Sequence, residues 1–134
     1  MAKTFKLEIV TPERVVYSES VSSLIAPGIH GYVGILADHA PLMAELTIGE
    51  ISVTAADGKD EHIATAGGFM QVSENTVRIL ADTAEFGHEI DVDRAQQSIQ
   101  RAQERLGKSE GVDHARAQIS LLRAINRLRV ARGQ

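Results

Sequence analysis

The sequence lacks several of the residues on which common functional sites depend. It contains no cysteine, so disulfide bonds and thiolate metal sites are excluded. Tryptophan is also absent, and the aromatic residues are only two tyrosines and three phenylalanines. No apolar run approaches the ~20 residues of a membrane-spanning helix, and residues 1–6 lack the apolar core of a secretory signal. We therefore expect a soluble, cytoplasmic protein that does not insert into a membrane.

Charge divides the chain into two parts. Its 134 residues are enough for one ordinary domain, or for a small domain with an appendage. Residues 1–87 hold 5 Lys and Arg against 12 Asp and Glu, a net charge of −7, whereas residues 88–134 hold 9 against 6, a net charge of +3. All the aromatic residues lie in the acidic part, so the basic part has no ring on which a nucleobase could stack. This distribution argues against nucleic-acid binding.

The acidic part has the pattern of β-structure. Phe5, Leu7 and Ile9 alternate with polar residues, which is typical of a strand with one wet face, and Pro12 ends that strand. Asp57-Gly58 predicts a hairpin turn, and residues 73–75 mark another turn. Further runs rich in β-branched residues cover 15–17, 21–26, 48–54, 62–66, 69–72 and 77–81. We predict an antiparallel β-sandwich or flattened barrel of about ten short strands over residues 1–87.

Neither the glycine clusters of this part nor the histidines of the whole chain form a site of known type. The cluster from Gly28 to Gly34 has the wrong spacing for a dinucleotide-binding loop, and Gly67-Gly68 lacks the lysine and hydroxyl residue of a triphosphate-binding loop. The five histidines show no paired spacing of metal ligands, so we predict no metal site. Asp38-His39 alone is not a catalytic dyad. We therefore predict no catalytic residues.

The basic part has the pattern of two helices. Apolar residues follow one another three or four apart from Val92 to Leu106, and again from Ala115 to Leu128. Asp91 and Asp113 stand where N-caps are expected, and residues 107–111, with two glycines, separate the helices. Such a short connection predicts an antiparallel helical hairpin within residues 88–134. Helices of this length are marginal alone, so we expect a weakly held arm that a ligand or partner can move.

Four arginines fall within the last turns of the second helix. Arg123, Arg127, Arg129 and Arg132 are compatible with a solvated face that complements the negative end of the helix dipole. They are also compatible with binding to an acidic protein surface or to phosphate. Asp91 is likewise compatible with two roles. It is placed to cap the first helix, and with the arginine three residues later it is also compatible with ligand binding.

Three stretches together resemble one known family. They are residues 31–42, Gly-Tyr-Val-Gly-Ile-Leu-Ala-Asp-His-Ala-Pro-Leu; residues 66–69 with 81–84; and Ile-Asp-Val-Asp-Arg-Ala at 90–95 with Arg-Ala-Ile-Asn-Arg-Leu at 123–128. Along its whole length the chain resembles the epsilon subunits of bacterial F-type (rotary) ATP synthases. The resemblance implies an N-terminal β-sandwich, residues 1–87, and a C-terminal helical hairpin, residues 88–134, as the patterns also predict.

The resemblance further implies a function without catalysis. Members of the family belong to the central rotor, bind the gamma subunit and the ring of c subunits, and couple proton flow to ATP synthesis. The hairpin can extend along gamma, where its basic second helix meets an acidic segment of the catalytic subunits and inhibits ATP hydrolysis. The implied location is the cytoplasmic face of the bacterial inner membrane, as a peripheral part of the complex.

The resemblance also implies a nucleotide site. Some members bind ATP as a regulatory ligand and require no cofactor. They bind it through a motif that is matched here by Ile90, Asp91, Arg94 and Ala95. Arginines of the second helix complete that site, and the corresponding residues are Arg123 and Arg127. The arginines are expected to hold phosphate oxygens, and Asp91 to accept a hydrogen bond from the adenine amine.

Contacts with partner subunits are expected at the loops and at the basic helix. The tip from Gly28 to Gly34 approaches the c ring in relatives and often carries acid, whereas here it offers Ile29, His30 and Tyr32. Ala37 stands where a proline is usual. The expected partner contacts are made by His30, Tyr32, His39, Arg123, Arg127 and Arg129.

Two other functions remain open from the sequence. The first is a freestanding sensor that changes conformation on binding ATP outside any synthase. The second is hydrolysis at His39 with Asp38. Binding of gamma favours the rotor subunit, and tight ATP binding without gamma favours the sensor. A turnover that His39→Ala abolishes would favour the hydrolase.

Overall fold

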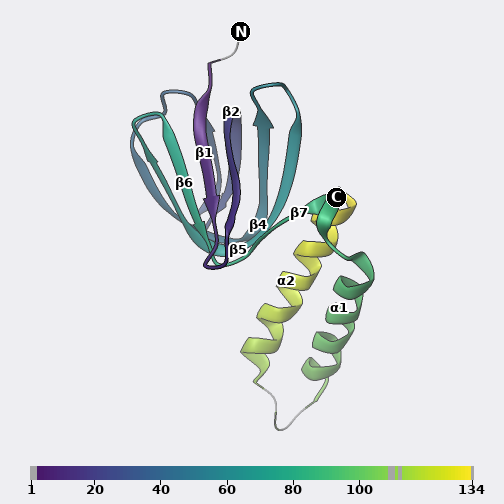
Figure 1. The fold of residues 1–134 in the computed structure, drawn as a ribbon. Helices are drawn as coiled ribbons and strands as arrows, with labels where there is room; N and C mark the ends of the chain where they lie inside the picture. Colours follow the sequence, from purple (N-terminus) through teal and green to yellow (C-terminus); the bar gives the residue numbers. More distant parts are fainter. Residues whose placement is uncertain (1–2, 109–110, 112, 134) are drawn as a thin grey trace.

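The computed structural model describes residues 3–108, 111 and 113–133, and it consists of a β-domain, residues 5–86, and a helical arm, residues 92–132 (Figure 1). The β-domain contains β1 (Phe5–Val10), β2 (Val15–Gly28), β3 (Gly31–Leu36), β4 (Leu42–Ala55), β5 (Asp60–Ser73), β6 (Thr76–Ala81) and β7 (Ala84–Phe86). A 3₁₀ turn, η1 (Gly87–Glu89), leads to α1 (Val92–Leu106) and α2 (His114–Arg132) of the arm. The predicted class, a β-sandwich followed by a helical hairpin, is confirmed.

The strands form one sheet that closes on itself. Their order is β1-β6-β5-β4-β2-β3, β1 also pairs with β2, and β7 pairs with β5. Five strands, β1, β6, β5, β4 and β2, therefore form a ring. A ring with an odd number of strands cannot be antiparallel throughout, and β1 and β6 are the parallel pair. The expectation of a purely antiparallel domain was wrong for this pair.

The strands are also fewer and longer than expected. The sheet has seven strands rather than about ten, and β2, β4 and β5 have 14 residues each. The prediction divided β5 at Gly67 and Gly68 and divided β2 at residues 18–20, whereas both strands continue through these positions. Gly67 and Gly68 lie inside β5 with φ of 93° and 121°, values that bend a strand without ending it. The two predicted turns are confirmed: Gly58 has φ of 87°, and Glu74 and Asn75 also have positive φ.

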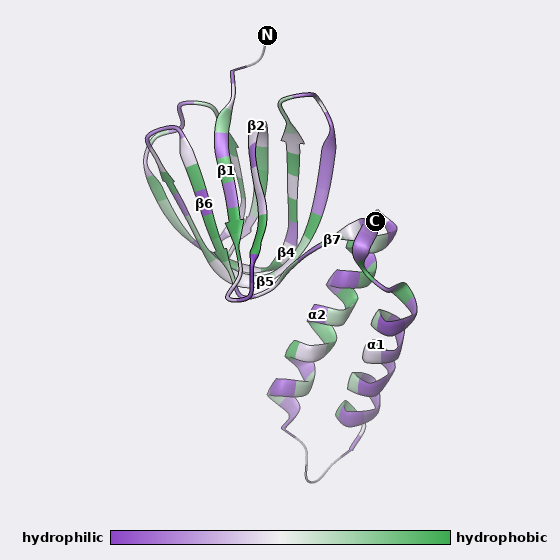
Figure 2. Ribbon diagram, viewed as in Figure 1, coloured by the Kyte–Doolittle hydropathy of each residue, from purple (hydrophilic) through white to green (hydrophobic). Residues whose placement is uncertain are grey.

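The core lies inside the closed sheet. Leu7, Ile9, Ile51 and Ile63 are completely buried, and Phe5 is 3% exposed, so the predicted inward face of β1 is confirmed. Each fully buried side chain of this size contributes about 1.5 to 3 kcal/mol. Figure 2 shows hydrophobic and hydrophilic residues alternating along β1 and β6, as expected for strands with one buried face.

Both predicted N-caps of the arm are confirmed. The Asp91 carboxylate accepts a hydrogen bond from the Arg94 backbone N–H at 3.1 Å, and Asp113 accepts one from the Arg116 N–H at 3.1 Å. The predicted connection, residues 107–111, includes residues 109 and 110, which lie outside the described part of the chain. Small side chains form the contact between the helices: the buried residues include Ala95, Ala102, Ala117 and Ala124. Each alanine buries little apolar area, and the weakly held arm stays a prediction.

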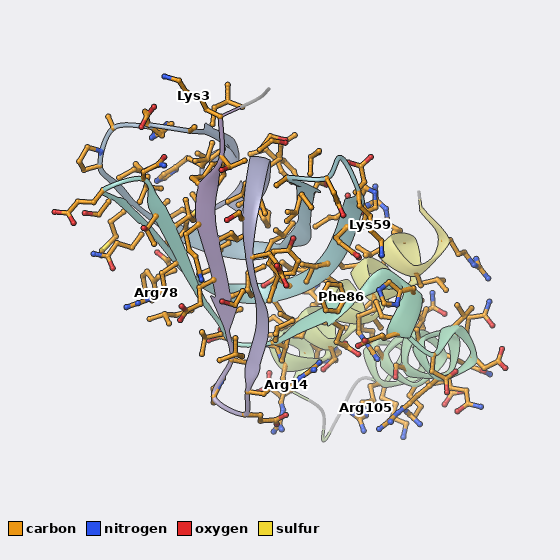
Figure 3. All side chains as sticks on the ribbon, turned by 45° about the horizontal axis from the view of Figure 1, so that its top comes forward. Lys3, Arg14, Lys59, Arg78, Phe86 and Arg105 are labelled. Carbon is orange, nitrogen blue, oxygen red and sulfur yellow. The ribbon has the colours of Figure 1, made fainter. Side chains whose placement is uncertain are left out.

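Tyr17 packs where the β-domain meets η1. Its ring lies 6.3 Å from that of Phe86, which Figure 3 places between the sheet and the helices. Burial raises the pKa of Tyr17, and Glu19, Glu61 and Asp57 raise that pKa further. We expect Tyr17 to ionise above the ordinary tyrosine value of about 10. Because the folded pKa then exceeds the unfolded one, the contribution of Tyr17 to the free energy of unfolding stays constant below about pH 10 and falls as pH rises through the folded pKa.

Ultraviolet absorbance of the Tyr32→Phe variant measures the ionisation of Tyr17, because these are the two tyrosines of the chain. The Tyr17→Phe variant gives the titration of Tyr32 as the control. A Tyr17 pKa at or below about 10 would contradict this expectation.

Candidate functional site

The arm contacts the β-domain through the last turns of α2. Figure 1 shows the C-terminal end of α2 beside β7, whereas the opposite end of the hairpin points away from the sheet. Val130 is 4% exposed and packs with Ala64 of β5 and Ile90. A Cβ on Gly87 would lie 2.8 Å from the Val130 carbonyl oxygen, so η1 and α2 are in close contact. A short length of helix therefore holds the whole arm.

Two polar side chains add to this apolar contact. The amide nitrogen of Asn126 donates to the Gly49 carbonyl at 2.8 Å and to the Thr65 carbonyl at 3.3 Å. Arg127 donates through Nε and one terminal nitrogen to the two carboxylate oxygens of Glu85, at 2.7 and 3.1 Å. The side chains of Arg127 and Glu85 are 25% and 38% exposed, so this bidentate pair is partly shielded from water.

A cavity of about 590 Å³ lies between the arm and the sheet. This volume is within the range of about 300 to 1,000 Å³ that is typical of small-molecule sites. Three parts of the fold supply the lining. The sheet contributes Ala64, Thr65, Ala66, Thr83 and Glu85; α1 contributes Ser98, Arg101, Ala102 and Arg105; α2 contributes Ser120, Arg123, Ala124, Asn126 and Arg127. The cavity therefore exists only while the arm is docked on the sheet.

The cavity is strongly cationic. Arg101 and Arg105 of α1 face it together with Arg123 and Arg127 of α2, and Glu85 is the one carboxylate on its described lining. Each helix presents its two arginines four residues apart, which places them on one face. The hydroxyl groups of Ser98, Ser120, Thr65 and Thr83 also belong to the lining residues. Several guanidinium groups and hydroxyls around one cavity are suited to a ligand with more than one phosphate.

The cavity brings together only some of the predicted nucleotide-binding residues. Arg123 and Arg127 line it, whereas its described lining does not include Ile90, Asp91, Arg94 or Ala95. Asp91 caps α1, Ile90 and Ala95 are buried, and Arg94 is exposed. The lining also includes four residues that were not predicted from the sequence: Arg101, Arg105, Glu85 and Asn126. The spacing of Arg101 and Arg105 was the available signal for two of these residues, because it repeats the spacing of Arg123 and Arg127.

The residues expected to contact partners lie at the surface or close to it. His30 is exposed, Tyr32 is 64% exposed, and His39 is half-buried with its Nδ1 atom 2.7 Å from the Ala40 carbonyl oxygen. Arg129 lines a smaller groove with Tyr32, between α2 and the sheet. Asp38 lies 3.6 Å from Lys3, and His39 contacts a backbone carbonyl, so these two residues are not arranged as a dyad.

Within residues 3–108, 111 and 113–133, no cluster of three His, Asp or Glu side chains is arranged to hold a metal ion. No described helix has the length and apolar content required to cross a membrane.

Comparison with known proteins gives a consistent result over both parts of the chain. Residues 4–87 match the family described as ATP synthase, Delta/Epsilon chain, beta-sandwich domain, and residues 88–132 match its long alpha-helix domain. The ATP synthase epsilon chain of Syntrophomonas wolfei is 49% identical over 129 residues, which cover 96% of this chain and 94% of the relative. The epsilon chain of Desulfitobacterium hafniense is 48% identical and covers 98% of this chain and 99% of its own length.

Solved structures share the fold. A chain of the Euglena gracilis mitochondrial ATP synthase, solved as OSCP, F1 and c-ring, superposes with a TM-score of 0.79 at 21% identity and covers 89% of this chain and 76% of its own length. A chain of the central stalk and c-ring of the Tetrahymena thermophila enzyme superposes with a TM-score of 0.61 at 14% identity, covering 98% and 96%. Since both family matches and the relatives span nearly the full length, the chain belongs to the epsilon-chain family of ATP synthases.

Proposed function

We propose that this chain is a non-catalytic subunit of the central stalk of an F-type ATP synthase and that its arm regulates the enzyme in response to ATP. The observation that carries the proposal is an arm attached by a few residues of α2, with a cationic cavity between arm and sheet. The structural relatives belong to ATP synthase assemblies that contain the c-ring, which supports a position in the central stalk. The β-domain then binds the gamma subunit and the c-subunit ring, and the rotor couples proton flow to ATP synthesis.

The cavity is the proposed site of regulatory ATP. Arg101, Arg105, Arg123 and Arg127 supply the charge that a triphosphate requires, and Glu85 holds Arg127 in place. Because the ligand contacts both helices and the sheet, it binds only the docked arm. A ligand at ten times its dissociation constant stabilises the bound form by about 1.4 kcal/mol, which is significant for so small a contact.

Release of the arm exposes the same arginines for another partner. When α2 leaves the sheet, Arg123, Arg127 and Arg129 become free to bind an acidic segment of the catalytic subunits, and this contact inhibits ATP hydrolysis. ATP in the cavity and the acidic segment thus compete for Arg123 and Arg127. In this proposal the chain works at the cytoplasmic face of the bacterial inner membrane without entering it.

Binding to gamma tests the central-stalk assignment. We expect the full chain to form a stable one-to-one complex with purified gamma, detected by analytical ultracentrifugation. We also expect it to lower ATP hydrolysis by a catalytic complex depleted of its own epsilon subunit, with less inhibition as ATP rises. Tight ATP binding without any binding of gamma would instead identify a freestanding ATP sensor that uses the same cavity.

A further inference from the structure

The amide of Asn126 makes a contact that neither the charge of α2 nor its apolar stripe explains. One side-chain nitrogen donates to carbonyls on two neighbouring strands, Gly49 of β4 at 2.8 Å and Thr65 of β5 at 3.3 Å. Gly49 and Thr65 are direct partners in the β4–β5 ladder. Asn126 is therefore held at one fixed point on the sheet, 61 and 77 residues away along the chain.

This fixed point determines how α2 is rotated about its axis. Asn126, Arg127 and Val130 follow Arg123 by three, four and seven residues and so share one face of the helix. With Asn126 bound to the sheet, Arg123 and Arg127 face the cavity and Val130 reaches its apolar contact. Arg127 makes the other directional contact of α2, with the Glu85 carboxylate, but among the hydrogen bonds of the described residues only Asn126 joins α2 to backbone carbonyls of two paired strands.

The surroundings of Gly49 are tightly packed. A Cβ there would lie 2.5 Å from Cβ of Pro27 and 3.2 Å from the Tyr32 hydroxyl, so β4 lies close to β2 and β3 at this point. The carbonyl that Asn126 binds therefore belongs to a closely packed part of the sheet.

We propose that Asn126 is the positioning residue that docks the arm, and that its two hydrogen bonds orient the arginines of α2 toward the cavity. The use of those arginines for ATP rests on the proposed function, but the docking itself does not. Asn126 acts through the sheet carbonyls, and no direct contact with a ligand is required of it. Loss of its donors frees the arm even when every arginine is intact.

Hydrogen exchange of the full chain in nucleotide-free buffer tests this proposal, because it measures opening even when the open form is rare. Asn126→Asp keeps the shape and removes both donors. We expect amides of α2 to exchange roughly tenfold faster, while the β-domain is unchanged. Asn126→Leu removes the donors without adding charge, and we expect the same acceleration. Exchange within about twofold of wild type in both variants would overturn the proposal.

Asn75→Asp is the matched control. Asn75 also donates through its side-chain amide, to the Thr4 carbonyl at 3.0 Å, but it lies in the turn between β5 and β6. We expect this variant to accelerate exchange near β6 and to leave α2 at the wild-type rate. Equal acceleration of α2 by Asn75→Asp would show a general loss of stability and would overturn the role of Asn126.

The pH profile separates hydrogen bonding from packing. A protonated aspartic acid can donate to a carbonyl, so the exchange of Asn126→Asp relative to wild type at the same pH returns toward one as the pH falls through about 4, the ordinary pKa of aspartic acid. We expect no such return of the exchange rate in Asn126→Leu. If the exchange rate returned toward that of wild type in neither variant, the hydrogen-bond role of Asn126 would be overturned. The charged residues that share the cavity or the neighbouring groove with Asn126 are Glu50, Glu85, Arg101, Arg105, Arg123, Arg127 and Arg129.

ATP added to the same samples distinguishes the two proposals. If ATP slows exchange of wild-type α2, the arginine cavity binds it. If Asn126→Asp accelerates exchange but ATP has no effect on the wild type, docking by Asn126 stands and the nucleotide site is lost.

Discussion

Gly68→Ala is expected to destabilise the β-domain by about 3 kcal/mol or more. Gly68 has φ of 121°, a conformation that side chains rarely adopt, and a Cβ there would lie 2.1 Å from the Leu80 carbonyl oxygen and 2.8 Å from Cα of Ala81. Both neighbours are backbone atoms of β6, so no side-chain rotation can relieve the clash. The variant should unfold at least about 8 °C below the wild type. Thermal and urea denaturation followed by circular dichroism measure the loss.

Gly58→Ala separates the strain of a positive φ from the steric clash of the added Cβ. Gly58 also has positive φ, 87°, but its Cβ would meet nothing within 4 Å. The strain of the backbone remains while the clash disappears, so we expect a loss of only about 1 kcal/mol. If the two variants lost equal stability, crowding at Gly68 would not be the cause.

The difference between these two glycines also explains what could be predicted of the β-domain. Gly58 follows Asp57, and Asp-Gly is a local turn signal, so the β4–β5 hairpin was predictable. At Gly68, by contrast, β5 continues and pairs with β6. This pairing is a property of the tertiary structure, so the residues next to Gly68 give no local signal of it. The same reason hid the parallel pairing of β1 with β6, since strand order depends on closure of the ring.

The arm shows a similar division. Asp91 and Asp113 cap their helices through backbone N–H groups three residues away, so the sequence alone was enough to predict them. Arg123 and Arg127 were predictable as a pair on one face. Which face of α1 meets α2, however, depends on how the hairpin docks, and this is why Arg101 and Arg105 were missed. Asn126 has no charge or periodicity that distinguishes it from a solvated helix residue.

Arg127→Ala is expected to weaken ATP binding about 100-fold, measured by calorimetry with the full chain. Hydrogen bonds to charged groups contribute about 1.5 to 3 kcal/mol each, and 2.7 kcal/mol corresponds to a factor of about 100. Arg127 contributes twice in the proposed site. It lines the cavity, and its bidentate pair with Glu85 joins α2 to β7, so the variant loses a phosphate ligand and part of the docking contact.

Two other variants give this prediction its controls. Arg132→Ala removes the same charge from the exposed end of α2, outside the described lining, and should change the affinity by less than about threefold. Arg94→Ala tests the motif at the start of α1 separately, because Arg94 is exposed and does not belong to the described lining. A large loss of ATP affinity in Arg94→Ala would show that the motif moves toward the arginines when ATP binds. If Arg127→Ala and Arg132→Ala bound ATP equally well, the cavity would not be the phosphate site, because only Arg127 lies on its described lining.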